Sequence, residues 1–180
     1  GFVEQEAPPE PAGTWPEYGF TAAGTRANQA LPLAPPFRQQ WSHDAKALLE
    51  FPPVIEKNIL VAGTNSGDVF ALDLPSGRLL WQVKVTGLVA SSPAIRDGIA
   101  YVATTKGRLV AFDAATGRRL WRRQLGSSIE SSPVLFAQGL YVGTLDGELF
   151  KLDRRTGAIT WRVKAPGPIK SAVAIWEKKV

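Results

Sequence analysis

The 180-residue sequence contains no cysteine and no methionine. Without cysteine the chain can form no disulfide, no zinc–thiolate site and no thiol nucleophile. A complete gene product normally begins with methionine, so we expect this chain to be a processed or excised segment, from which an upstream signal or membrane anchor could have been removed. The sequence also lacks any apolar run near the roughly 18 residues that a membrane-spanning helix needs.

Acidic residues are scarce outside the first part of the chain. The whole chain has a net charge of +5, and residues 1–20 carry four glutamates and no Lys or Arg, which leaves +9 on residues 21–180. A basic body is one feature of nucleic-acid-binding proteins. However, no aromatic platform for stacking bases is interleaved with the arginines. We therefore interpret the excess charge as a solvated surface and expect no nucleic-acid partner.

A 40-residue repeat organises the sequence. Periods of 20 to 50 residues are typical of solenoids, propellers and arrays. Tryptophan, aspartate and glycine recur at this spacing without a gap, at Trp41, Trp81, Trp121 and Trp161, at Asp73, Asp113 and Asp153, and at Gly77, Gly117 and Gly157.

One unit of the repeat reads as four short strands. Segments 91–96, 99–105, 108–113 and 118–124 are rich in β-formers and separated by turns. The first turn, Asp97-Gly98, is the dipeptide that a type I′ hairpin favours. Segments 69–72 and 109–112 are apolar on both faces, which indicates sheet stacked on sheet. The prediction is an all-β fold, a β-propeller of four-stranded antiparallel blades.

The recurring residues are interpreted as architecture. An indole has a large apolar face and one N–H donor, so each tryptophan can stack on a neighbouring blade and still pair its nitrogen. The Asp-x-x-Ser/Thr-Gly segments are interpreted as turns, with a capping carboxylate and a left-handed glycine, and not as metal sites.

Residues 1–40 do not join the repeat. This Pro- and Glu-rich segment is expected to begin as a linker, and its Trp15-Pro16 and Tyr18-Gly19 pairs look able to pin it onto the propeller. Segment 31–37 contains three prolines and cannot be a central strand. The repeat region is 41–180, with units near 41–80, 81–120 and 121–160 and a truncated unit at 161–180.

The segments ALDLPSGRLLW, AFDAATGRRLW and KLDRRTGAITW resemble the tryptophan-docking motif of the pyrroloquinoline quinone (PQQ) β-propeller repeat family. The resemblance implies seven or eight blades, so residues 41–180 would form about 3.5 blades of a larger parent. The opening WPEYGF is further similar to bacterial extracytoplasmic members. An open arc of blades leaves edges unpaired and invites self-association.

Some members of the family are quinoprotein dehydrogenases, which hold PQQ and Ca²⁺. Calcium takes six to eight oxygen ligands, and outside the repeated turns the sequence shows no Asp, Asn or Glu cluster. The cysteine pair that such enzymes often place beside the quinone is absent, and the single histidine, His43, has no partner nearby in sequence. No catalytic residue is assigned and no cofactor is expected, although PQQ with Ca²⁺ stays open as an alternative.

Glu50, Glu130 and Lys170 occupy equivalent positions just before the innermost strand of each unit, where Ala90 stands in another copy. Because these positions differ while the framework agrees, they are candidate contacts at the mouth of the central channel.

The leading hypothesis is therefore a non-catalytic extracytoplasmic scaffold in the periplasm or on the cell surface that binds a protein or peptide. It resembles the propeller lipoproteins of the outer-membrane barrel-assembly machinery, and its parent could be membrane-anchored. The alternatives are a fragment of a PQQ- and Ca²⁺-dependent dehydrogenase and a ligand-sensing surface domain.

Overall fold

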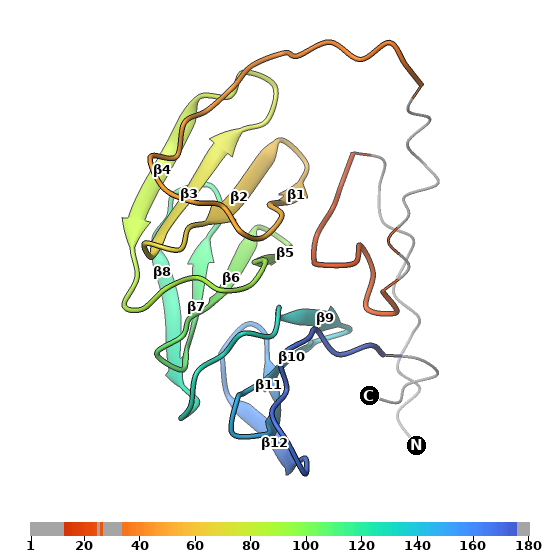
Figure 1. Cartoon of the computed structure of the whole chain (residues 1–180), viewed down its shortest axis with the longest axis vertical. Helices are drawn as coiled ribbons and strands as arrows, with labels where there is room; N and C mark the ends of the chain where they lie inside the picture. The colour runs from red at the N-terminus through yellow and green to blue at the C-terminus, as the bar shows by residue number, and fades with distance from the viewer. Residues whose placement is uncertain (1–12, 25, 27–33, 176–180) are drawn as a thin grey trace.

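The described part of the chain folds into three antiparallel sheets of four strands each (Figure 1). The structure is a computed structural model that describes residues 13–24, 26 and 34–175. Blade 1 comprises β1 (Val54–Glu56), β2 (Ile59–Gly63), β3 (Asp68–Asp73) and β4 (Leu79–Lys84). Blade 2 comprises β5 (Ala94–Arg96), β6 (Ile99–Ala103), β7 (Arg108–Asp113) and β8 (Arg119–Gln124). Blade 3 comprises β9 (Val134–Phe136), β10 (Gly139–Gly143), β11 (Glu148–Asp153) and β12 (Ile159–Lys164).

The first hairpin of each blade follows from its turn residues. In blade 2, Asp97 and Gly98 both have positive φ, 53° and 72°, and β5 pairs with β6 across them. The predicted type I′ geometry is thus confirmed, because that turn requires positive φ at both central positions. Lys57 in blade 1 and Ala137 in blade 3 take the same left-handed conformation, with φ of 54° and 50°.

The core lies between the blades. Residues 69–72 of β3 and 109–112 of β7 are buried on both faces, as their apolar runs predicted. One hydrophobic cluster joins the facing sides of blades 1 and 2, including Val69, Trp81 and Phe112, and a second joins blades 2 and 3. Each sheet is therefore stabilised mainly by burial against the next one.

The blades fan out from one side. The innermost strands of neighbouring blades, β1, β5 and β9, adjoin one another, while β4, β8 and β12 lie at the outer rim (Figure 1). The prediction of an all-β partial propeller is confirmed by this arrangement.

Residues 41–48 take the place of an outermost strand beside blade 1, although they are not assigned as one. Leu48 O accepts the Asn65 N–H at 3.1 Å, just as Leu88 O accepts the Thr105 N–H at 3.0 Å one blade further along. The three sheets span residues 54–84, 94–124 and 134–164. The outermost strand of each sheet therefore crosses the end of the predicted repeat unit, at residue 80, 120 or 160. Within the proline-rich segment, residues 34–37 form no strand, and 31–33 lie outside the described residues, as does the linker over 1–12.

Candidate interaction surfaces

Three indoles each donate one hydrogen bond to the blade that follows. The acceptors are backbone carbonyls in the turn before the outermost strand of that blade. The bonds run from Trp41 Nε1 to Leu74 O (2.7 Å), from Trp81 Nε1 to Ala114 O (2.8 Å) and from Trp121 Nε1 to Arg154 O (3.1 Å).

The face of each of these indoles lies against a turn glycine. Gly117 has φ of 72°, and a Cβ built on it would lie 2.6 Å from Cδ2 of Trp81. Gly77 and Gly157 meet Trp41 and Trp121 in the same way. These positions require glycine twice over, because a side chain would be strained in the left-handed region and would also overlap the ring.

The aspartates hold the same turns. Asp113 Oδ1 accepts the backbone N–H of Ala115 and both the N–H and the hydroxyl of Thr116, and Asp153 does the same with its own turn. In the first copy, Asp73 accepts from Ser76. The hydroxyl of Thr116 is the main cause that lowers the pKa of Asp113. These carboxylates are thus engaged in capping turns.

Trp161 differs from the other three. Its side chain on β12 is 37% exposed, whereas Trp81 and Trp121 are each 8% exposed. Ile159 and Val163 on the same strand are also exposed, and no hydrogen bond joins the Trp161 indole to a described residue. The outer half of blade 3 therefore presents an apolar face.

The lead-in segment 14–22 runs across the innermost strands of successive repeats. Trp15 exchanges two backbone hydrogen bonds of 2.7 Å with Ile55, and Pro16 O accepts the Ile95 N–H at 2.6 Å. Further along the segment, Glu17 Oε2 accepts the Leu135 N–H at 2.5 Å, and Ala22 O accepts the Ile175 N–H at 2.7 Å.

The four residues that this segment meets are spaced by 40, so it meets each repeat at the same position. Glu17 is fully buried, and Thr14 and Phe20 are nearly so. We call residues 14–22 the axial strap. It occupies the inner edge of the arc with the protein's own chain (Figure 1). Sequence reasoning placed this segment on the propeller, but it did not single out Glu17.

A second tie that sequence reasoning missed joins the blades at their first hairpins. The Glu56 carboxylate accepts the N–H groups of Asp97 and Gly98 at 2.7 and 2.8 Å. Asp97 Oδ2 in turn pairs with Nη2 of the buried Arg154 at 2.5 Å, and this bond lowers the pKa of Asp97. Burial beside this pair raises the pKa of Tyr101 to about 12. One chain of contacts thus links all three blades.

Glu50 and Glu130 precede the innermost strands β1 and β9, and Lys170 holds the same repeat position ahead of residues 171–175, which are not assigned as a strand. Glu50 and Lys170 are exposed and Glu130 is half-buried. The neighbouring loops of blades 2 and 3 touch, because Ser92 N–H donates to Ser132 Oγ at 3.1 Å. No ion pair or hydrogen bond joins Glu50, Glu130 and Lys170 to one another.

Nothing in the described residues assembles a metal site. No group of three or more His, Cys, Asp or Glu side chains lies together there. His43 packs its ring against Phe70, with centroids 5.2 Å apart. Within the same residues, no helix is long and apolar enough to cross a membrane.

A family model described as outer membrane protein assembly factor BamB, built on the PQQ repeat, matches residues 37–139 and 128–180. The chain belongs to this PQQ-repeat propeller family. No curated protein sequence matches it.

Several solved β-propeller structures are similar in fold to this chain. BamB from Moraxella catarrhalis is 26% identical, with a TM-score of 0.64 over 69% of this chain and 39% of that one. A quinohemoprotein alcohol dehydrogenase from Comamonas testosteroni is 24% identical, with a TM-score of 0.71 over 84% of this chain and 27% of that one. A europium-containing methanol dehydrogenase is 22% identical, with a TM-score of 0.71 over 87% and 32%. The chain spans about a quarter to two fifths of these proteins, and the two dehydrogenases show the fold alone.

Gly117→Ala should destabilise the protein by about 2–4 kcal/mol, because left-handed strain adds to overlap with Trp81. Gly98→Ala is the matched control, since Gly98 has the same φ of 72° and nothing within 4 Å of the added Cβ. It should cost only about 1–2 kcal/mol. Urea unfolding followed by tryptophan fluorescence measures both, and equal losses would contradict the docking role of Gly117.

Glu17→Ala should cost about 1–3 kcal/mol, because it leaves the buried Leu135 N–H without its acceptor. Glu17→Gln keeps an acceptor oxygen and should retain most of the stability. Hydrogen exchange at the Leu135 amide reads the local effect, with faster exchange expected only in the alanine variant. Unchanged exchange in that variant would show that the axial strap does not protect β9.

Proposed function

We propose that the protein is a non-catalytic extracytoplasmic scaffold that binds a protein or peptide partner. Membership in the family described as outer membrane protein assembly factor BamB supports an assembly role and a place in the periplasm or at the cell surface. The likeness to dehydrogenases brings no activity with it, because at 24% and 22% identity it shows the fold alone.

The observation that carries the proposal is a set of loops with the same backbone and different side chains. Val89, Ile129 and Ile169 each donate their N–H to a threonine carbonyl of the preceding blade, at 3.0–3.2 Å. The next residues are Ala90, Glu130 and Lys170. A rigid framework thus presents a neutral, an acidic and a basic side chain in succession, which is how scaffolds build specific binding surfaces.

Site-specific photo-crosslinking in the full-length protein tests this proposal. A photoreactive residue at Glu130 or at Lys170 should capture one common partner in the cell envelope. Ala115 is the control position, because it is exposed in the turn at the opposite end of blade 2. Charge reversal by Glu130→Lys should weaken that partner's binding about tenfold. Equal capture from Ala115, or no effect of the reversal, would contradict the assignment.

Calorimetric titration of the same full-length protein with PQQ and Ca²⁺ separates the scaffold from the dehydrogenase. The scaffold predicts no binding heat. Saturable binding near one site per protein would overturn the non-catalytic part of the proposal.

A further inference from the structure

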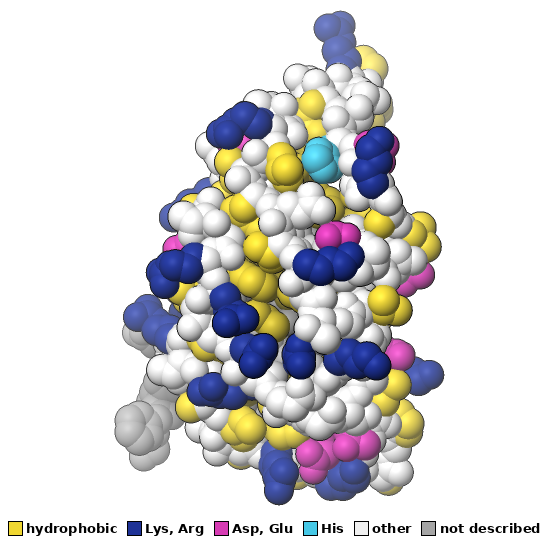
Figure 2. All heavy atoms as spheres, turned by 90° about the vertical axis from the view of Figure 1, so that its left-hand side faces the viewer, with side chains coloured by type: hydrophobic (Ala, Val, Ile, Leu, Met, Phe, Trp, Pro, Cys, Tyr) yellow, Lys and Arg dark blue, Asp and Glu magenta, His cyan; other side chains and the backbone are white. Residues whose placement is uncertain are grey.

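A groove of about 220 Å³ lies at the outer rim between blades 1 and 2. Val83 of β4 and Val85, which directly follows that strand, line one side, and Val110 and Phe112 of β7 line the other. Figure 2 faces this rim and shows hydrophobic side chains exposed in the hollow between Lys and Arg side chains. The groove therefore has an apolar floor with a basic border.

The charge around this rim groove is of one sign. Arg108, Arg119 and Arg122 line it, and no Asp or Glu does. The side chains of Arg119 and Arg122 are exposed, and their guanidinium groups form no hydrogen bond or ion pair with a described residue. Their guanidinium groups are therefore available to a ligand.

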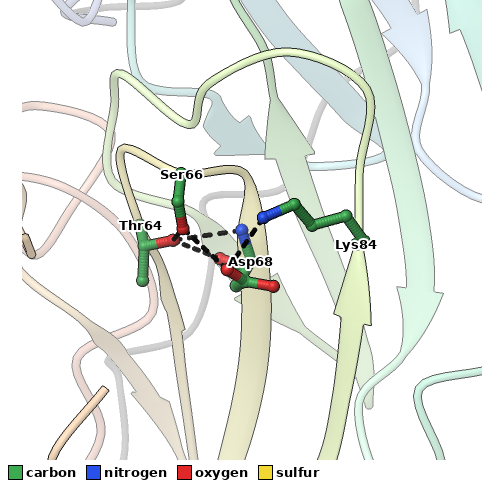
Figure 3. A network of polar contacts seen from close by, with 4 residues as sticks. All are labelled: Thr64, Ser66, Asp68 and Lys84. Atoms are coloured by element: carbon green, nitrogen blue, oxygen red, sulfur yellow. Dashed lines mark hydrogen bonds and ion pairs between the residues drawn. The ribbon is translucent and has the colours of Figure 1, made fainter. Parts of the chain in front are cut away.

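The excess charge arises from one position of the repeat. In blade 1 this position is Asp68, which accepts from Ser66 (2.6 Å) and from Lys84 Nζ (3.0 Å), with Thr64 completing the network (Figure 3). The Ser66 and Lys84 bonds keep the pKa of Asp68 low. A carboxylate here thus neutralises the basic residue on the outermost strand.

Blades 2 and 3 diverge at this position. In blade 3 it is Glu148, whose carboxylate lies 3.9 Å from Arg162. In blade 2 it is Arg108, whose guanidinium donates to the neutral Gln124 Oε1 at 3.4 Å. Blade 2 alone therefore adds a cation where its neighbours supply an anion, and the charge of Arg122 is left unbalanced.

The rim groove is open at a place that a longer side chain fills between blades 2 and 3. Between blades 2 and 3, Arg123 reaches across and donates to Gly157 O at 2.7 Å and Thr156 O at 3.1 Å, so its guanidinium fills the corresponding place. The equivalent residue between blades 1 and 2 is Val83, which is too short to reach that turn.

We propose that the rim groove binds an acidic peptide segment that carries one large apolar side chain between carboxylates. The apolar floor would take the side chain, and the three guanidiniums match carboxylates in bidentate geometry. Nucleic acid fits less well, because the aromatic ring in the groove, Phe112, is only 4% exposed and offers no stacking face. This inference rests on the proposed scaffold function and assigns it a second surface, whose lining does not include the candidate channel-mouth residues.

Fluorescence anisotropy with the labelled peptide Asp-Glu-Phe-Glu-Asp tests the inference on the intact chain. Saturable binding is expected, at least tenfold tighter than for Asp-Glu-Gly-Glu-Asp, which lacks the apolar side chain. Equal affinity for the two peptides, or tighter binding of a single-stranded oligonucleotide of equal charge, would overturn the inference.

Three variants locate the site. Arg119→Glu with Arg122→Glu should weaken binding at least tenfold, while Arg118→Glu with Arg155→Glu makes the same change of charge outside the groove and should have a much smaller effect. Val83→Arg should also abolish binding although it adds positive charge, because the new guanidinium would fill the groove as Arg123 does. Unchanged binding in the first or the last variant would overturn the inference.

The two proposals can fail separately. Glu130→Lys should leave peptide binding unchanged, since Glu130 does not line the rim groove. Loss of crosslinking at the channel mouth with retained peptide binding would reject only the proposed partner site there. Retained crosslinking without peptide binding would reject only the rim groove.

Discussion

The contact between an indole and the turn glycine of the next blade sets the geometry on which the rest of the structure depends. Each contact combines burial of a large aromatic face with one hydrogen bond to a backbone carbonyl. Since the carbonyl and the glycine belong to one turn, the donor blade is fixed in both distance and orientation. Repetition of the contact from Trp41 to Trp121 produces the arc, and it buries the apolar strand faces that stabilise each sheet.

The framework was predictable because its causes are local and repeated. Trp81, Asp113 and Gly117 belong to sets of identical residues that recur every 40 positions. The dipeptide Asp97-Gly98 by itself indicates a type I′ turn. The contacts between distant segments were not predictable, because nothing near them in sequence signals a partner. Glu17 meets Leu135 across 118 positions, and Arg154 meets Asp97 across 57. For Glu130 and Lys170, the register gives the position but not what they contact.

The surface of each blade differs from that of its neighbours at the positions where the copies of the repeat carry different residues. A strict repeat would place a carboxylate at Arg108 and a valine at Arg123, as at Val83 and Val163. It would likewise present identical loops at the channel mouth, where Ala90, Glu130 and Lys170 now differ. The docking contacts make these changes tolerable, because they hold the backbone in place while single side chains vary on the surface. Binding specificity can therefore be built without altering the fold.

The indole N–H hydrogen-exchange rates, measured by NMR on the folded chain, test the docking account most directly. The account predicts that the N–H groups of Trp41, Trp81 and Trp121 exchange slowly, because each is bonded to a carbonyl of the next blade, while that of Trp161 exchanges much faster. Similar rates for all four indoles would contradict the claim that these bonds hold the arc together.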